Sequence, residues 1–232
     1  MDIDNIAWIP FQELFPLQRD EVFLFYGTDS MFRSLPIVDL LTADEILRAN
    51  RLIHNQQSVW VASHASLRLL CSKILRIKPL EIVFHQTEFG KPFLNGFPFH
   101  FNLSHSNNSF LIAFSLKSIG VDIEPIELTQ NHLDVVNYAF SEEERIVCEN
   151  GTNQEQFYAI WTAKEAFCKA MGEGLVDGLS EMNVVGFSSN SINDSHFKHK
   201  TFFCPNGEMG SVVFDSSTRH IRFFHLVDHR TL

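Results

Sequence analysis

Two carboxylates lie two residues apart in the stretch IGVDIEP, where Gly120 and Pro125 frame Asp122 and Glu124. Alternate residues of a strand point to the same face, so both carboxylates would project together. They would repel each other unless a proton or a cation lay between them. An isolated pair of this kind is also compatible with a solvated strand edge. The pattern leaves both a cation site and a polar edge open.

A second charged group lies in WTAKEAFCKAMGEG, where aromatic and small apolar residues surround Lys164, Glu165 and Lys169. In a helix Glu165 and Lys169 share a face, and Lys164 is displaced from Glu165 by about 100°. The simpler interpretation is a surface Glu–Lys pair that contributes a few tenths of a kcal/mol. If Glu165 joined Asp122 and Glu124, the three carboxylates would form a ligand set that suits Mg²⁺.

A third group combines Lys91 in FGKPF with Ser104 and His105 in FNLSHSNNS. The turn residues around Lys91 allow its side chain to reach outward, and alternating apolar residues deliver Ser104 and His105 to the end of a strand. A lysine, a hydroxyl and an imidazole can all donate hydrogen bonds to phosphate. A catalytic triad is not favoured, because NLSHS lacks the glycines of a nucleophile elbow. A structural role in a hairpin is the alternative.

The elements that must position these residues follow from capping and hydrophobic patterns. Helices are predicted at residues 42–50 and 58–75, from a capping box at Ser141, and from a third box at Thr152 to near Gly172. Strands are predicted at residues 21–27, 80–87, 97–104, 109–116, 118–124, 182–188, 198–204, 210–215 and 220–227.

Because strand, helices and meander occur twice, we expect an α+β protein of two similar subdomains, residues 1–116 and 117–232. Each would pack helices on a small, mainly antiparallel sheet, with the active site at their interface.

Composition limits the class of protein. The chain has 232 residues, 45% of them hydrophobic, and a formal net charge of −10, which argues against a general nucleic-acid binder. Four cysteines without a CxxC pair argue against a disulfide framework or a zinc site. No apolar run approaches the length of a membrane span. We therefore expect a cytoplasmic protein without a nucleic-acid or membrane partner.

The motifs together resemble a known family. IGVD followed by WTAKEAFCK, with 164 − 122 = 42 residues from Asp122 to Lys164, resembles the signature of the 4′-phosphopantetheinyl transferase superfamily. The upstream FGKP and NLSHS, and the two similar halves, resemble its larger, surfactin-synthetase-activating branch. This branch is expected to be monomeric, since both halves of the site lie in one chain.

The resemblance implies transfer of the phosphopantetheine arm of coenzyme A to a serine of an apo acyl or peptidyl carrier protein, with release of 3′,5′-ADP. It implies Mg²⁺, with Mn²⁺ as an alternative, held by Asp122, Glu124 and Glu165, and catalysis by Asp122, Glu165 and Lys169. The coenzyme would be bound in the first half and its pyrophosphate in the second. The implied coenzyme contacts are Arg48, Lys91, Ser104, His105, Lys164 and Lys169.

One stretch departs from the family pattern. Relatives often carry a basic run between the two N-terminal helices, whereas here the stretch IHNQQSVW offers only His54 as a candidate cation. This leaves the full set of 3′-phosphate contacts open. Two other functions also remain open: a non-catalytic module that binds coenzyme A or a carrier protein, and a metal-dependent phosphodiesterase acting on coenzyme A.

Overall fold

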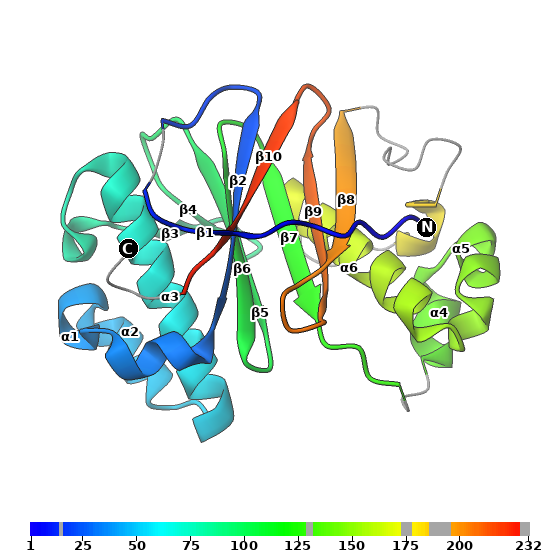
Figure 1. Ribbon diagram of the computed structural model, residues 1–232, viewed down its shortest axis with the longest axis horizontal. Helices are drawn as coiled ribbons and strands as arrows, with labels where there is room; N and C mark the ends of the chain where they lie inside the picture. Colours follow the sequence, from blue (N-terminus) through cyan, green and yellow to red (C-terminus); the bar gives the residue numbers. More distant parts are fainter. Residues whose placement is uncertain (14–15, 129–131, 173–177, 186–195, 228–232) are drawn as a thin grey trace.

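In the computed structural model, a five-stranded and a three-stranded sheet lie at the centre, with helices on both outer sides (Figure 1). The structure describes residues 1–13, 16–128, 132–172, 178–185 and 196–227. Helices and sheets are mixed without a regular alternation, which confirms the predicted α+β class.

The larger sheet joins the two ends of the chain. Its strand order is β1 (Ile9–Pro10), β10 (His220–His225), β2 (Glu21–Thr28), β6 (Ser109–Ser115) and β5 (His100–Ser106). The pairs β2–β6 and β5–β6 are antiparallel, whereas β1–β10 and β10–β2 are parallel. The predicted boundary at residues 116 and 117 falls between β6 and β7. However, β10 belongs to the predicted second half and pairs with β2 of the first half. The division into two subdomains stays a prediction.

The smaller sheet has the order β7 (Ile119–Glu124), β9 (Met209–Asp215) and β8 (Phe197–Phe203), with antiparallel pairs throughout. A separate short hairpin pairs β3 (His85–Gln86) with β4 (Pro92–Phe93). The strand predicted at residues 80–87 is therefore mostly wrong, since a 3₁₀ turn, η2 (Pro79–Glu81), replaces its start. Of the strand predicted at residues 182–188, residues 182–185 are not in a strand and the rest lie outside the described residues.

The helices form two groups. On the larger sheet lie α1 (Ile37–Leu40), α2 (Ala43–Ala49) and α3 (His54–Leu75), and on the smaller sheet lie α4 (Leu133–Ala139), α5 (Glu142–Val147) and α6 (Gln154–Met171) (Figure 1). The other 3₁₀ turns are η1 (Asp29–Ser34), η3 (Glu149–Gly151) and η4 (Leu179–Glu181).

Two predicted capping boxes are confirmed, and one is wrong. The side chains of Thr42 and Ser141 each accept from the backbone three residues on, and Glu45 and Glu144 return the bond. At α6 the cap is Asn153, which accepts from the backbone N–H of Gln156 at 3.2 Å. Thr152 instead donates to the Glu149 carbonyl and continues the preceding turn.

Alternating side chains create separate cores. Phe23 and Phe25 of β2 pack towards α1–α3, while Val22, Leu24 and Tyr26 pack between the two sheets. A third cluster joins α4–α6 to the smaller sheet. The layers therefore run helices, sheet, sheet, helices. No helix in the described part of the chain is long and apolar enough to cross a membrane.

Candidate active site

A close approach of β7 to α6 creates the site. A Cβ atom added at Gly120 would lie 1.9 Å from the Ala166 carbonyl oxygen and 2.4 Å from the Ala170 nitrogen. Only glycine allows this separation, because real Cβ contacts are longer than 3.0 Å. The side chains on the same face of β7 are those of Asp122 and Glu124, so they are held next to the last turns of α6.

Asp122 lies at the centre of a short polar network. Lys169 of α6 donates to Asp122 Oδ1 at 2.5 Å and to Ser104 Oγ at 3.0 Å. The Ser104 hydroxyl donates to the same Asp122 oxygen at 2.9 Å. Asp122 is 3% exposed, whereas the Lys169 side chain is 30% exposed. A buried carboxylate is thus neutralised by a lysine that still reaches solvent.

A row of polar side chains on β5 holds β7 in place. Asn102 accepts from the Val121 backbone N–H at 2.8 Å. Ser104 donates to Asp122, and Ser106 donates to Glu124 Oε2 at 3.1 Å. β5 and β7 are edge strands of different sheets, so these alternate residues join the two sheet edges. The same contacts orient the two carboxylates.

The carboxylates perturb one another. Burial and the Asp122 charge raise the pKa of Glu124 to about 7, against the opposing effects of Ser106 and Lys169. Burial and the Asp122 charge also raise the pKa of Glu165, and Lys169 opposes the shift. Such mutual shifts arise where carboxylates share a poorly solvated site.

These residues fit a hard divalent cation. Asp122 Oδ2 is buried and has no hydrogen-bond partner among the described residues, so one oxygen is available as a ligand. Glu124 and Glu165 lie close enough for the Asp122 charge to raise the pKa of each. Within the described ranges no group of three acidic, histidine or cysteine side chains is arranged to hold a metal ion. Instead, Lys169 supplies the positive charge next to Asp122. The donor set is all oxygen, which suits Mg²⁺.

A cavity of about 940 Å³ lies beside this network. The fold brings several of the predicted site residues together in its wall: Arg48 from α2, Ser104 and His105 from β5, and Lys169 from α6. Burial and the charge of Lys169 lower the pKa of His105. Because Ser104 and Lys169 belong to both the cavity wall and the carboxylate network, the cavity adjoins this network.

Lys91 lies at the seam between the halves and does not line this cavity, although Gly90 and Pro92 do. Its ammonium donates to the carbonyls of Ile119 and Ala170, each at 3.1 Å. Burial lowers the pKa of Lys91 to about 8. In this structure Lys91 joins the FGKP turn to the end of α6. Its implied role as a coenzyme contact stays a prediction.

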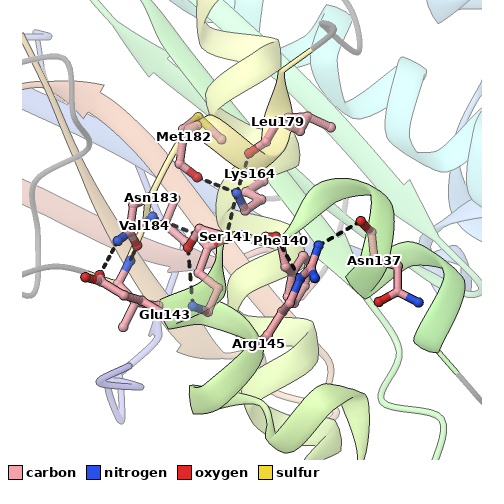
Figure 2. A network of polar contacts seen from close by, with 12 residues as sticks. Asn137, Phe140, Ser141, Glu143, Arg145, Lys164, Leu179, Met182, Asn183 and Val184 are labelled. Carbon is pink, nitrogen blue, oxygen red and sulfur yellow. Dashed lines mark hydrogen bonds and ion pairs between the residues drawn. The ribbon is translucent and has the colours of Figure 1, made fainter.

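Lys164 lies apart from the other site residues, in a buried polar network. Its side chain is fully buried and pairs with the fully buried Glu144 at 2.8 Å. It also donates to the carbonyls of Leu179 at 2.6 Å and Met182 at 2.5 Å (Figure 2). Its ammonium is thus enclosed by protein acceptors, and its implied contact with the coenzyme stays a prediction. The physical reason for its separate position is its displacement around the helix from Glu165.

Three residues near the site were not predicted. Ser106 could have been found, since it alternates with Ser104 on the same strand. Trp60 and His64 of α3 line the cavity, and their rings stack with centroids 3.8 Å apart. Their spacing of four residues places them on one face of a helix but carries no signal of a ligand.

Comparison with known proteins identifies the same part of the chain as the geometry does. The family model of the 4′-phosphopantetheinyl transferase superfamily matches residues 118–218, which include β7 and α6. The chain is 30% identical to 4′-phosphopantetheinyl transferase HetI of Nostoc sp., over 73% of this chain and 76% of that protein. It is 31% identical to 4′-phosphopantetheinyl transferase Sfp of Bacillus subtilis, over 56% of this chain and 61% of that protein.

A further relative is 4′-phosphopantetheinyl transferase gsp of Aneurinibacillus migulanus, 34% identical over 47% of this chain and 46% of that protein. The match thus spans about half the length of some curated relatives and about three quarters of HetI. On this coverage and identity, the chain belongs to the 4′-phosphopantetheinyl transferase superfamily.

Proposed function

We propose that this protein transfers the 4′-phosphopantetheine arm of coenzyme A to a serine of an apo acyl or peptidyl carrier protein and releases 3′,5′-ADP. The observation that carries the proposal is the convergence of Asp122, Ser104 and Lys169 where a large cavity meets the β7–α6 junction. The names of the relatives support the same reaction.

Asp122, Glu124 and Glu165 are proposed to hold Mg²⁺. The bound cation would neutralise charge on the pyrophosphate of coenzyme A. The unpartnered Asp122 Oδ2 and the raised pKa values of both glutamates support this assignment. The choice between Mg²⁺ and Mn²⁺ is not determined by oxygen ligands alone.

The chain's own residues supply the remaining chemistry. The serine oxygen of the carrier forms a bond to the phosphorus next to pantetheine, and the P–O bond of the pyrophosphate breaks, so that 3′,5′-ADP leaves. Lys169 would exchange its contact with Asp122 for a phosphate oxygen and stabilise the charge that develops there. Glu165 would be placed to take the serine proton. Arg48 and His105 would bind the coenzyme in the cavity.

The arrangement also supports a monomer with a coenzyme-binding first half (residues 1–116) and a metal-binding second half (residues 117–232). Both sides of the proposed site come from one chain, through β5 and β7. Sedimentation velocity measures this directly, and an obligate oligomer would contradict it.

Incubation with coenzyme A, Mg²⁺ and an apo carrier domain, followed by mass spectrometry, tests the function. Addition of the arm to the carrier supports the transferase. Free phosphopantetheine without transfer would indicate a phosphodiesterase, and no change would indicate a binding module. Asp122→Ala should abolish the reaction, and Asp134→Ala, at an exposed carboxylate of α4, is the matched control.

A further inference from the structure

One wall of the cavity has no role in the chemistry proposed above. It is formed on α3 by Trp60 and His64, whose ring planes are 19° apart. Trp60 is 6% exposed, and the guanidinium carbon of Arg48 lies 5.8 Å from its ring centroid. The His105 ring of β5 is 6.4 Å from that of His64. His64 therefore faces the cavity on a rigid support.

The hydrogen bonds of His64 define its tautomer. Nδ1 lies 2.9 Å from the Trp60 carbonyl oxygen, which can only accept, so Nδ1 carries the hydrogen. The Ser63 hydroxyl also donates to this carbonyl, at 3.0 Å, so its own lone pairs face Nδ1 at 3.3 Å. In a neutral ring Nε2 then has a lone pair and no hydrogen. No described residue hydrogen-bonds to Nε2.

The surroundings keep the ring neutral. Burial lowers the pKa of His64 to about 3, and electrostatic interactions with His105, Arg48 and Arg68 add to the shift. The Trp60 carbonyl acts in the opposite direction but more weakly than burial. His105, Arg48 and Arg68 come from β5, α2 and α3, so groups on all three elements disfavour a positive charge on the His64 ring.

We propose that His64 is a specificity-determining residue that accepts, at Nε2, a hydrogen bond from an N–H or O–H group of the coenzyme. This inference rests on the proposed function, because it takes coenzyme A as the occupant of the cavity. An ionised phosphate oxygen cannot donate, so His64 selects against phosphate at this wall. Phosphates are left to the cationic side chains of Arg48 and Lys169 and to the imidazole of His105. Coenzyme A offers donors in its amide, hydroxyl and amino groups.

Nitrogen-15 NMR of the histidines in the whole protein tests the proposal directly. In the free protein at pH 7, His64 should show the neutral Nδ1–H tautomer. On addition of coenzyme A, the Nε2 resonance should shift as expected for an accepted hydrogen bond, without protonation of the ring. An Nε2–H tautomer, or protonation on binding, would overturn the proposal.

Calorimetry with coenzyme A gives an independent measurement. His64→Leu should weaken binding roughly two- to tenfold, the effect of one neutral hydrogen bond. His64→Gln retains an acceptor near Nε2 and should bind close to the parent, as should the control His220→Gln at an exposed position. If His64→Leu binds coenzyme A as tightly as the parent, the role of His64 is refuted and the proposed function is not affected. Failure of the parent to bind coenzyme A would instead refute the proposed function. Thermal melts show whether a variant folds, and if His64→Leu does not fold, the NMR result on the parent decides.

Discussion

Lys164 and Lys169 lie five residues apart on α6, and the structure gives them opposite roles. Lys164→Met would remove the ammonium and leave the carboxylate of Glu144 buried. Its remaining donors among the described residues are the N–H groups of Ser141 and Val184. Both partners of the pair are 0% exposed, so solvent offers no compensation. Loss of one member of a buried ion pair costs about 3–5 kcal/mol. This is a large part of the roughly 5–15 kcal/mol that stabilises a typical domain.

Lys169→Met should behave in the opposite way. Its side chain is 30% exposed, and Asp122 keeps the Ser104 hydroxyl as a donor, so we expect a loss of only about 1–2 kcal/mol. Transfer should fall about a hundredfold or more, the usual effect of removing a group that stabilises charge in the transition state.

Urea denaturation followed by tryptophan fluorescence measures stability, and transfer rates are then divided by the folded fraction. Lys164→Met should lower the urea midpoint strongly and keep its rate per folded molecule. The double variant Lys164→Met/Glu144→Gln should recover part of the stability, because it removes the unpaired charge. The assignment fails if Lys164→Met is as stable as the parent, or if it is folded and inactive.

Three further outcomes are expected. Asp122→Ala should abolish transfer with little loss of stability, because it also relieves repulsion with the glutamates. Thermal melts and steady-state rates measure the two effects, and near-normal turnover would contradict the proposed site. Lys91→Ala should cost about 1–3 kcal/mol through two lost bonds to carbonyls and should affect coenzyme A and dephospho-coenzyme A equally, as calorimetry would show. In metal-free protein, Glu124 should make unfolding easier as pH rises from about 4.5 to 7, because its raised pKa of about 7 lets the folded state retain a proton that the unfolded chain has released. Glu124→Gln should remove this component from the difference in melting temperature, and an unchanged pH profile would refute it.

The sequence predicted the fold where the signal was local. The capping boxes at Thr42 and Ser141 involve residues three apart, and the strands β2 and β6 have strong apolar runs. The position of β10 could not be predicted, since its parallel pairing with β2 joins segments about 200 residues apart. A local hydrophobic pattern predicts a strand but not its neighbour.

The sequence did not distinguish the surroundings of the two lysines of α6. Five residues correspond to about 140° around a helix, so Lys164 and Lys169 had to lie on different faces. The sequence did not reveal which face would meet Asp122. The surroundings of Lys164 are set by Glu144 and by the carbonyls of Leu179 and Met182, which belong to other segments of the chain.

The serines of β5 show how the fold and the site depend on each other. The alternating apolar residues predicted a strand that delivers Ser104 and His105 to its end, and the observed strand continues to Ser106. β5 and β7 are edge strands, so no backbone ladder joins their sheets there, and side chains must make the junction. Two of the acceptors at that junction are the carboxylates of Asp122 and Glu124. A substitution such as Ser106→Ala would therefore loosen the junction and the proposed metal site together, and calorimetry with Mg²⁺ beside a urea titration would show both effects in one variant.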